Sequence, residues 1–377
     1  RERRRSPRVS PRKPLQTPSS VDIAVTGRCN LACAYCFYAD EMNWRDDLST
    51  QDWLRVISRL GGLSVMRVCL TGGEAFTRPD LFEIVDGCID AGMRYGILTN
   101  GTLIDDGVLR KFDKGRRRLR LDYIQVSIDG HEASVHDAMR PGSFDRATAA
   151  LALLKSEGFP VNVRMTISPS NLGCIEQTAE FLLDGIGLEW FSTNESFRMG
   201  AGCDRCDSVL SNPQRLEAMH TFERLLARYP GRIRAQAGPQ AKLATYRQME
   251  RARSTGELPD SWEMGRLTGC GCVFDRLGIM HDGTIVPCHV LHGLSLGNAL
   301  TDPIGDIWLG HPVLEALRGR RSIRMADIPA CSGCEWAPFC NGSCPGIALE
   351  KTGSFDMPNP EDCYARFTAE TGVRLRG

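Results

Sequence analysis

The chain has 377 residues, 42% of them hydrophobic, and its 46 basic side chains balance 46 acidic ones. A net charge of zero argues against a general nucleic-acid binder, and the apolar content allows a sizeable buried core in about two domains. The sequence contains no apolar run of the ~18 residues needed to cross a bilayer and no signal-peptide pattern. Sixteen cysteines in such a chain are typical of metal ligands and reduced thiols, so we expect a cytoplasmic protein without a membrane partner.

The N-terminal segment is strongly basic, with seven basic side chains, one acid and two prolines in its first thirteen residues. Such a composition predicts a disordered basic tail over residues 1–20. The tail suits an acidic leader peptide or RNA, but a solvated tail is the favoured interpretation.

Residues 21–200 alternate short β-branched runs with amphipathic stretches. Ser49 and Asp52 form a capping pattern ahead of one helix, and Pro79-Asp80 opens another. Later helices are expected at Phe144–Leu154 and Cys174–Leu183. The expected strands are Val21–Thr26, Val65–Leu70, Tyr95–Thr99, Tyr123–Ile128, Val161–Ile167 and Leu188–Thr193.

Six strand–helix units predict an α/β fold, a partial (β/α)6 TIM-like barrel over 21–200. Residues 201–268 predict bridging helices at Gln214–Tyr229 and Gln240–Arg251. Residues 269–377 are turn-rich and cysteine-rich, which predicts a second, metal-organised module.

Three cysteines follow the first expected strand in the spacing CxxxCxxC, at Cys29, Cys33 and Cys36. Three thiolates can hold three irons of a cubane cluster, which leaves the fourth iron open to a substrate or cofactor. A zinc site is the alternative. It is disfavoured because no histidine or fourth cysteine lies within thirty residues downstream of Cys36.

Other motifs follow later strands. Gly72-Gly73-Glu74 comes after the second expected strand, Asn100-Gly101 after the third, and Ser127 and Asp129 lie at the end of the fourth. Because the C-terminal ends of barrel strands meet at one rim, we expect these segments to converge beside the cysteine loop.

The C-terminal module carries a second cysteine system. A tandem zinc ribbon is the alternative, but ligation by cysteine alone favours iron–sulfur clusters. The cysteines concerned are Cys272, Cys288, Cys331, Cys334, Cys340, Cys344 and Cys363.

Together the three cysteine motifs, in this order, resemble the radical S-adenosylmethionine (SAM) enzymes that carry a C-terminal SPASM domain. The resemblance runs from about Val21 to Phe367. It implies a [4Fe–4S] cluster on Cys29, Cys33 and Cys36 whose open iron binds the amino and carboxylate groups of SAM.

The resemblance also implies SAM-binding residues around that cluster. Tyr35 would lie near the adenine. The motif Gly72-Gly73-Glu74 would let the backbone approach SAM, with the carboxylate of Glu74 accepting from the SAM ammonium. Ser127 and Asp129 would lie by the ribose and methionine. Arg140 and Arg164 are candidates for the SAM carboxylate, with simple ion pairs as the alternative.

Two auxiliary [4Fe–4S] clusters are implied as well. Auxiliary cluster II would be held by Cys331, Cys334, Cys340 and Cys363, and auxiliary cluster I by Cys272, Cys288 and Cys344. Cys270 is the expected fourth ligand of cluster I, although its spacing departs from the family pattern. The alternative is an iron left open to substrate.

A further pair, Cys203 and Cys206, lies outside the family motifs. A redox pair, a metal site and a reduced pair without a special role all stay open for it.

The resemblance implies that a reduced cluster cleaves SAM and that the resulting 5′-deoxyadenosyl radical removes a hydrogen from substrate. The favoured substrate is a ribosomally synthesised precursor peptide, which would receive a crosslink or another oxidative modification. The alternatives are an anaerobic sulfatase maturase and a dehydrogenase or epimerase of a sugar or aminoglycoside. The implied partners are the peptide, an electron donor such as ferredoxin or flavodoxin, and a separate leader-recognition protein. A nucleic-acid partner is not expected.

Overall fold

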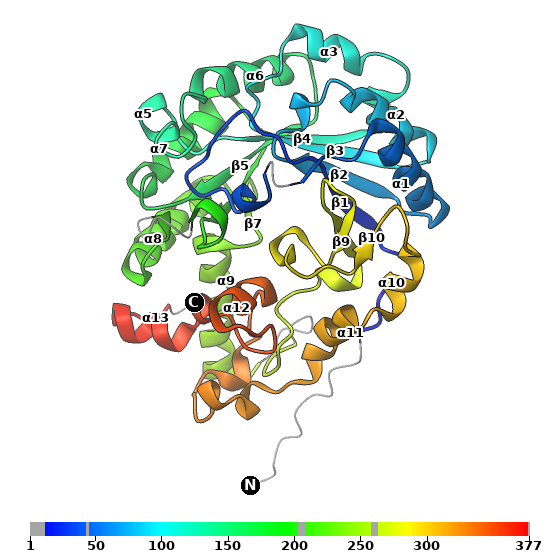
Figure 1. Cartoon of the computed structure of the whole chain (residues 1–377). Coiled ribbons are helices and arrows are strands. Elements are labelled where there is room, and N and C mark those ends of the chain that lie inside the picture. The colour runs from blue at the N-terminus through cyan, green and yellow to red at the C-terminus, as the bar shows by residue number, and fades with distance from the viewer. Residues whose placement is uncertain (1–11, 43–44, 203–207, 258–262, 376–377) are drawn as a thin grey trace.

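The computed structural model describes residues 12–42, 45–202, 208–257 and 263–375 (Figure 1). Their strands form one sheet in the order β10-β9-β8-β1-β2-β3-β4-β5-β6-β7, parallel from β8 to β7 and antiparallel from β8 to β10. The strands are β1 Ser20–Thr26, β2 Arg67–Gly72, β3 Arg94–Thr99, β4 Leu121–Ser127, β5 Val161–Ile167, β6 Phe191–Glu195, β7 Ile233–Ala235, β8 Arg276–Ile279, β9 Thr284–Val286 and β10 Gly297–Asn298.

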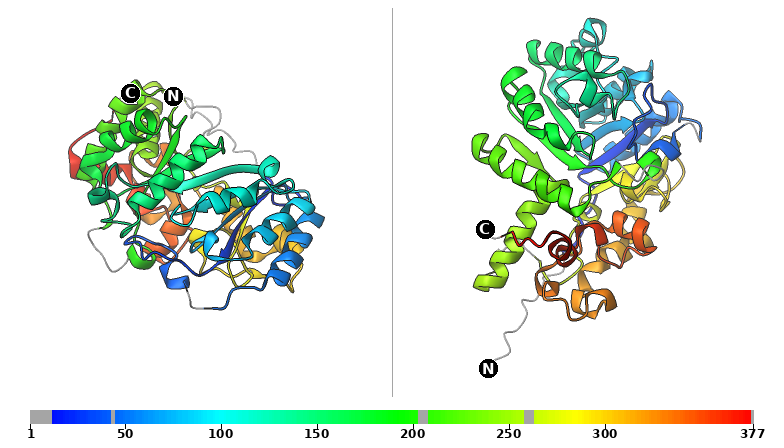
Figure 2. Two further views of the ribbon diagram at one scale, coloured as in Figure 1. Left: turned by 90° about the horizontal axis from the view of Figure 1, so that it is seen from above. Right: turned by 90° about the vertical axis from the view of Figure 1, so that its left-hand side faces the viewer.

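Helices connect the parallel strands and cover the outer face of the sheet (Figures 1 and 2). The helices are α1 Thr50–Gly62, α2 Leu81–Asp90, α3 Asp106–Phe112, α4 Arg117–Arg120, α5 Ala133–His136, α6 Phe144–Ser156, α7 Ile175–Glu180, α8 Asn212–Arg228, α9 Gly238–Thr255, α10 Ile304–Gly310, α11 Pro312–Gly319, α12 Pro345–Thr352 and α13 Tyr364–Thr371. The fold is therefore the expected α/β partial barrel followed by a small C-terminal domain.

Helix α1 illustrates how the sequence specifies an element. The Ser49 hydroxyl accepts a hydrogen bond from the backbone N–H of Asp52 at 3.1 Å, which confirms the predicted cap. The helix buries Trp53, Val56 and Leu60 against the sheet. These three positions recur at helical spacing, so burial of one apolar face explains why the segment is helical.

All six expected strands are present, but two begin later than predicted. Strand β2 begins at Arg67, not at Val65, and β6 begins at Phe191, not at Leu188. The helix before β6 ends in a π-helical turn, and the backbone N–H of Leu188 donates to the Leu182 carbonyl at 3.0 Å. Leu188 thus belongs to the connection, where its buried side chain produces the apolar pattern of a strand.

Strands β7 and β8 extend the parallel sheet beyond the predicted six. Strand β8 lies more than 250 residues after β1, yet pairs with it in parallel through Ile23 and Ile279. The C-terminal region therefore contributes one edge of the barrel sheet. Its last two helices, α12 and α13, lie beside the lower end of α9 (Figures 1 and 2).

The disordered tail predicted for residues 1–20 is fixed from residue 12 onward; residues 1–11 lie outside the described part of the chain. The Leu15 N–H donates to the Phe274 carbonyl at 3.0 Å, and the Trp308 indole N–H donates to the Leu15 carbonyl at 2.7 Å. The Arg12 guanidinium lies 5.0 Å from the centre of the Phe274 ring. These contacts hold the segment against the C-terminal domain.

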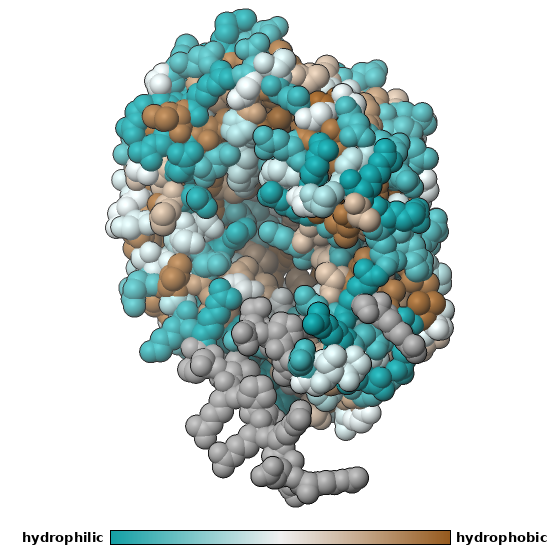
Figure 3. All heavy atoms as spheres, turned by 180° about the vertical axis from the view of Figure 1, so that it is seen from behind, coloured by the Kyte–Doolittle hydropathy of each residue, from teal (hydrophilic) through white to brown (hydrophobic). Residues whose placement is uncertain are grey.

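No helix in the described ranges is both long and apolar enough to cross a membrane. The surface seen from behind is hollowed near its centre, and hydrophilic residues surround much of the hollow (Figure 3).

Candidate active site and auxiliary cluster sites

The first three cysteines share the loop that follows β1. Cys29, Cys33 and Cys36 are all partly buried, and the Cys36 N–H donates to the Cys33 carbonyl at 3.2 Å, which tightens the turn between them. Burial raises the pKa of each thiol, and the charge of a neighbouring thiolate adds to the shift at Cys29 and at Cys36, whose pKa rises to about 11. The three thiols are thus close enough to interact electrostatically, as ligands of one cluster must be.

A buried carboxylate organises the residues around this loop. Asp129, which is fully buried after β4, accepts hydrogen bonds from Arg140 Nε at 2.6 Å, from the Tyr35 hydroxyl, and from the Thr166 N–H at 2.7 Å. The other end of the Arg140 guanidinium lies 3.8 Å from Cys33 Sγ. The structure therefore brings Tyr35, Asp129 and Arg140 together at the cysteine loop.

Two glycines allow the loop after β2 to lie against the cysteine loop. A Cβ atom at Gly73 would lie 2.1 Å from the Arg28 carbonyl oxygen, and one at Gly72 would lie 2.2 Å from the Thr26 carbonyl oxygen. Gly72 also has a φ of +129°, which L side chains rarely adopt. Only glycine fits at these two positions, so the GG motif here has a direct steric cause.

Glu74 follows the glycines and is 1% exposed. Its carboxylate accepts hydrogen bonds from the Asn100 N–H at 2.7 Å and the Thr99 hydroxyl at 2.8 Å, which join the ends of β2 and β3. Burial raises its pKa, and these hydrogen bonds oppose the shift. The sequence did not predict the role of Thr99, because a threonine at a strand end gives no distinguishing signal. Contact between Glu74 and the SAM ammonium stays a prediction.

Ser127 and Arg164 lie opposite each other in the registers of β4 and β5. Ser127 ends its strand at the rim, but the Arg164 guanidinium extends to Gln125 at 3.5 Å, with Tyr123 and Cys69 near it. The two arginines proposed for the SAM carboxylate thus occupy different places, Arg140 beside the cysteine loop and Arg164 deeper in the barrel.

Four cysteines meet around the predicted auxiliary cluster I. The Cys270 and Cys272 sulfur atoms are 3.2 Å apart, and a hydrogen bond shared between these thiols lowers the pKa of Cys270. A hydrogen bond from Cys272 likewise lowers the pKa of Cys288, and Cys344 is close enough to Cys270 and Cys288 for their charges to raise its pKa beyond the effect of burial. Cys270 therefore lies where a fourth ligand would be needed, and its ligation stays a prediction.

A buried arginine lies beside the four cysteines of the predicted auxiliary cluster I. Arg320 is 2% exposed, its Nε has no hydrogen-bond partner, and it makes no ion pair with a carboxylate in the described chain. The groups whose charges act on it are the thiol of Cys270, the carboxylate of Asp356 and the thiols of Cys344 and Cys272. Because no carboxylate forms an ion pair with this buried cation among the described residues, thiolates or a cluster at this place fit the residues present.

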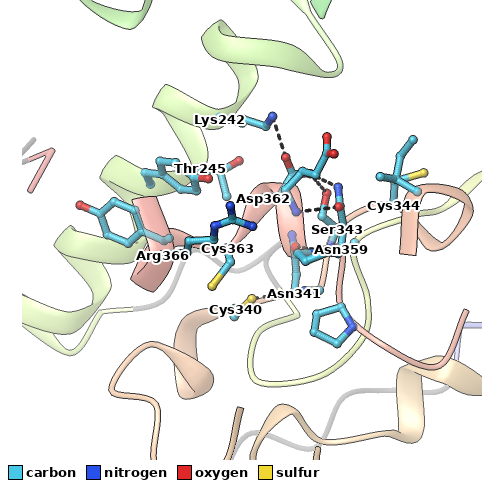
Figure 4. Close-up of a pocket in the computed structure, with 18 of the residues that line it drawn as sticks. Lys242, Thr245, Cys340, Asn341, Ser343, Cys344, Asn359, Asp362, Cys363 and Arg366 are labelled. Carbon is cyan, nitrogen blue, oxygen red and sulfur yellow. Dashed lines mark hydrogen bonds and ion pairs between the residues drawn. The ribbon is translucent and has the colours of Figure 1, made fainter. Parts of the chain in front are cut away.

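The remaining cysteines line a pocket of about 640 Å³ against α9. Cys340 and Cys363 direct their sulfur atoms toward the same part of it, and Cys344 lies on its other side (Figure 4). Cys331 and Cys334 complete the set. The loop before Cys363 is anchored where Lys242 Nζ lies 2.8 Å from Asp362 and 2.9 Å from Glu195.

The cysteine donors suit iron–sulfur clusters. Within the described residues, no three His, Cys, Asp or Glu side chains are arranged to hold one metal ion. A cubane has a different requirement, because each thiolate reaches a separate iron. Cys203 and Cys206 lie outside the described residues.

Comparison with known proteins agrees with this geometry. Residues 23–182 match the model of the radical SAM superfamily, and residues 270–335 match that of an iron–sulfur cluster-binding domain, SPASM. The chain belongs to the radical SAM superfamily and carries a C-terminal SPASM domain. Its cofactors are SAM and [4Fe–4S] clusters.

The radical SAM/SPASM chain has curated relatives of more than one activity. It is 28% identical over 355 residues to the AdoMet-dependent heme synthase of Methanosarcina barkeri, covering 92% of this chain and 97% of the relative. It is 25% identical over 376 residues to the PqqA peptide cyclase of Granulibacter bethesdensis, covering 96% and 92%.

The fold is also that of a solved structure, Streptococcus suis SuiB bound to the precursor peptide SuiA. The TM-score is 0.70 at 18% identity, with 93% of this chain and 76% of that chain covered. SuiB has also been solved bound to S-adenosylmethionine, with a TM-score of 0.68 to this chain at 17% identity and coverage of 93% and 78%.

Proposed function

We propose that this radical SAM/SPASM enzyme removes a hydrogen atom from a ribosomally synthesised precursor peptide and installs a crosslink or another oxidative modification. The observation that carries the proposal is the convergence of the Cys29–Cys36 loop, Asp129 and Arg140 on one rim, in a chain with further thiols for auxiliary clusters. The PqqA peptide cyclases among its relatives and the fold shared with peptide-bound SuiB favour a peptide substrate.

When bound, the cluster and SAM supply a 5′-deoxyadenosyl radical that abstracts the hydrogen. The residues of this chain position the reactants. Cys29, Cys33 and Cys36 would each hold one iron of the cluster, and the close approach permitted by Gly73 would shape the wall of the SAM site. Arg140, fixed by Asp129, would direct positive charge toward the SAM carboxylate.

The auxiliary sites give the chain an electron path. The substrate radical formed by hydrogen abstraction must lose an electron and a proton to become a closed-shell product. We infer that the thiols at Cys270, Cys272, Cys288 and Cys344 hold the acceptor of that electron, and that an external donor such as ferredoxin or flavodoxin reduces the first cluster.

A second candidate is an oxidation of a porphyrin side chain. It is favoured by the heme synthase relative, which is 28% identical and 97% covered by this chain. In both proposals the radical chemistry is the same, and only the molecule beside SAM differs.

Product mass separates the candidates. The anaerobically reconstituted enzyme would be incubated with SAM, dithionite and either a precursor peptide encoded near its gene or Fe-coproporphyrin III. A two-hydrogen mass loss in the peptide, located by fragmentation, supports peptide maturation. Conversion of the porphyrin alone would reject that proposal in favour of the second candidate.

A further inference from the structure

The inner face of β5 carries polar side chains. Val163 and Met165 belong to the hydrophobic core, so Asn162 and Arg164, which alternate with them, face the opposite side, into the barrel. Arg164 is in register with Ser127 at the rim and with Ser192 on β6. The Arg164 backbone thus lies level with the rim, and its guanidinium extends from there deeper into the barrel, toward Gln125.

Arg164 has no counter-ion among the described residues. Its only hydrogen bond is a long one, from Nη2 to Gln125 Oε1 at 3.5 Å, and its buried Nε has no partner. Burial lowers its pKa, and the groups that oppose the shift are Tyr123 and Cys69, not a carboxylate. A half-buried guanidinium without an anion is unfavourable, and folded proteins retain such groups where they have a use.

Arg276, another arginine of the barrel, has the counter-ion that Arg164 lacks. Arg276 on β8 also lies near Tyr123 and Cys69, but its guanidinium has Asp22 at 3.7 Å. Arg140 likewise has Asp129 at 2.6 Å. Arg164 therefore differs from Arg276 and Arg140, each of which pairs with a carboxylate.

Two amides beside Arg164 lack partners as well. Asn162 Oδ1 on β5 and Asn194 Oδ1 on β6 are buried without a hydrogen bond. Asn194 also lines the large pocket that extends toward the C-terminal domain. Unpaired polar atoms gathered on the inner faces of two adjacent strands are expected where a polar ligand binds.

The SAM carboxylate is a poorer match for Arg164 than for Arg140. Arg140 lies 3.8 Å from Cys33 Sγ and shares Asp129 with Tyr35, so it is already fixed at the cluster loop. The groups that interact most strongly with Arg164 are Tyr123 and Cys69, which lie on the strands below that loop.

We propose that Arg164 binds a carboxylate group of the substrate inside the barrel. This inference rests on the proposed function, because it assumes that the substrate enters the barrel beside SAM. A carboxylate is common to both substrate candidates, as a glutamate or aspartate side chain of a peptide or as a propionate of a porphyrin. A guanidinium binds a carboxylate through two parallel N–H donors and would fix the distance between the target carbon and SAM.

The test measures binding to the anaerobically reconstituted enzyme with SAM present. The porphyrin arm compares coproporphyrin III with its tetramethyl ester, followed by fluorescence. The peptide arm compares a glutamate-containing candidate peptide with its glutamine analogue. In one arm at least, R164Q should weaken binding of the acid about tenfold or more. Its affinities for the neutral analogue and for SAM should equal those of the wild type.

Two further variants control the measurement. R164K keeps the charge and should recover part of the affinity, which separates a lost ion pair from a misfolded strand. R67Q removes an exposed arginine of β2 that pairs with Asp122, and should change neither affinity.

The proposal is overturned if the wild type binds neither acid, if R164Q binds both as tightly as the wild type, or if only SAM affinity falls. Release of 5′-deoxyadenosine by the wild type is scored separately. Its absence would reject the proposed function, whereas the binding arms would still report on Arg164.

Discussion

Replacing Asp129, which follows β4, by asparagine should destabilise the barrel far more than the same replacement at Asp122 on β4. Asp129 is fully buried, and it neutralises Arg140, whose side chain is only 12% exposed. Removing one partner of a buried ion pair costs roughly 3–5 kcal/mol, since the other charge stays buried. Asparagine can still accept from the Thr166 N–H, so we expect about 3 kcal/mol, the lower end of that range.

The matched control is D122N, at the other end of β4. Asp122 is 20% exposed and pairs with Arg67 and Arg94, which are 65% and 39% exposed. Such surface pairs contribute less than about 1 kcal/mol each. Urea titration of the reduced apo-protein, followed by circular dichroism, would compare the two variants. Equal losses of unfolding free energy, or a loss below about 1 kcal/mol for D129N, would refute the reasoning.

The other predictions concern the glycine loop, a core thiol and an auxiliary site. G73A should abolish SAM binding in equilibrium dialysis, because its methyl group would lie 2.1 Å from a carbonyl oxygen; G62A, which has nothing within 4 Å, should bind SAM normally. Burial raises the pKa of Cys88 to about 12, so the unfolded state releases this proton first and apo-protein stability should fall as pH rises above about 9. The fall in urea midpoint should be smaller in C88A, and an equal fall would contradict the assignment. R320Q should lower the reduction potential of an auxiliary cluster in a redox titration monitored by electron paramagnetic resonance, whereas an unchanged potential would contradict the contact with cluster thiolates.

The part of the site that could be read from the sequence is the part that is local in sequence. The cysteine loop, the glycines and Asp129 belong to short motifs at strand ends, and parallel strands bring their ends together at one rim. Tyr35 and Arg140 were expected near SAM; the structure brings both of them to the carboxylate of Asp129, and their contact with SAM stays a prediction.

Local sequence patterns do not indicate which distant strands pair or which side chains become buried. Strand β8 has only four residues, and its partner β1 is more than 250 residues away, so no local pattern marks the pair. No local sequence pattern marks Arg320 as buried, yet packing buries it near the thiols of Cys270 and Cys344.

Release of 5′-deoxyadenosine tests the central claim most directly. The reconstituted enzyme, with dithionite and SAM under anaerobic conditions, should convert SAM to 5′-deoxyadenosine and methionine, and C33A should not, because it loses one of three cluster ligands. No 5′-deoxyadenosine from the wild type, or an undiminished amount from C33A, would contradict radical chemistry at the Cys29–Cys36 loop.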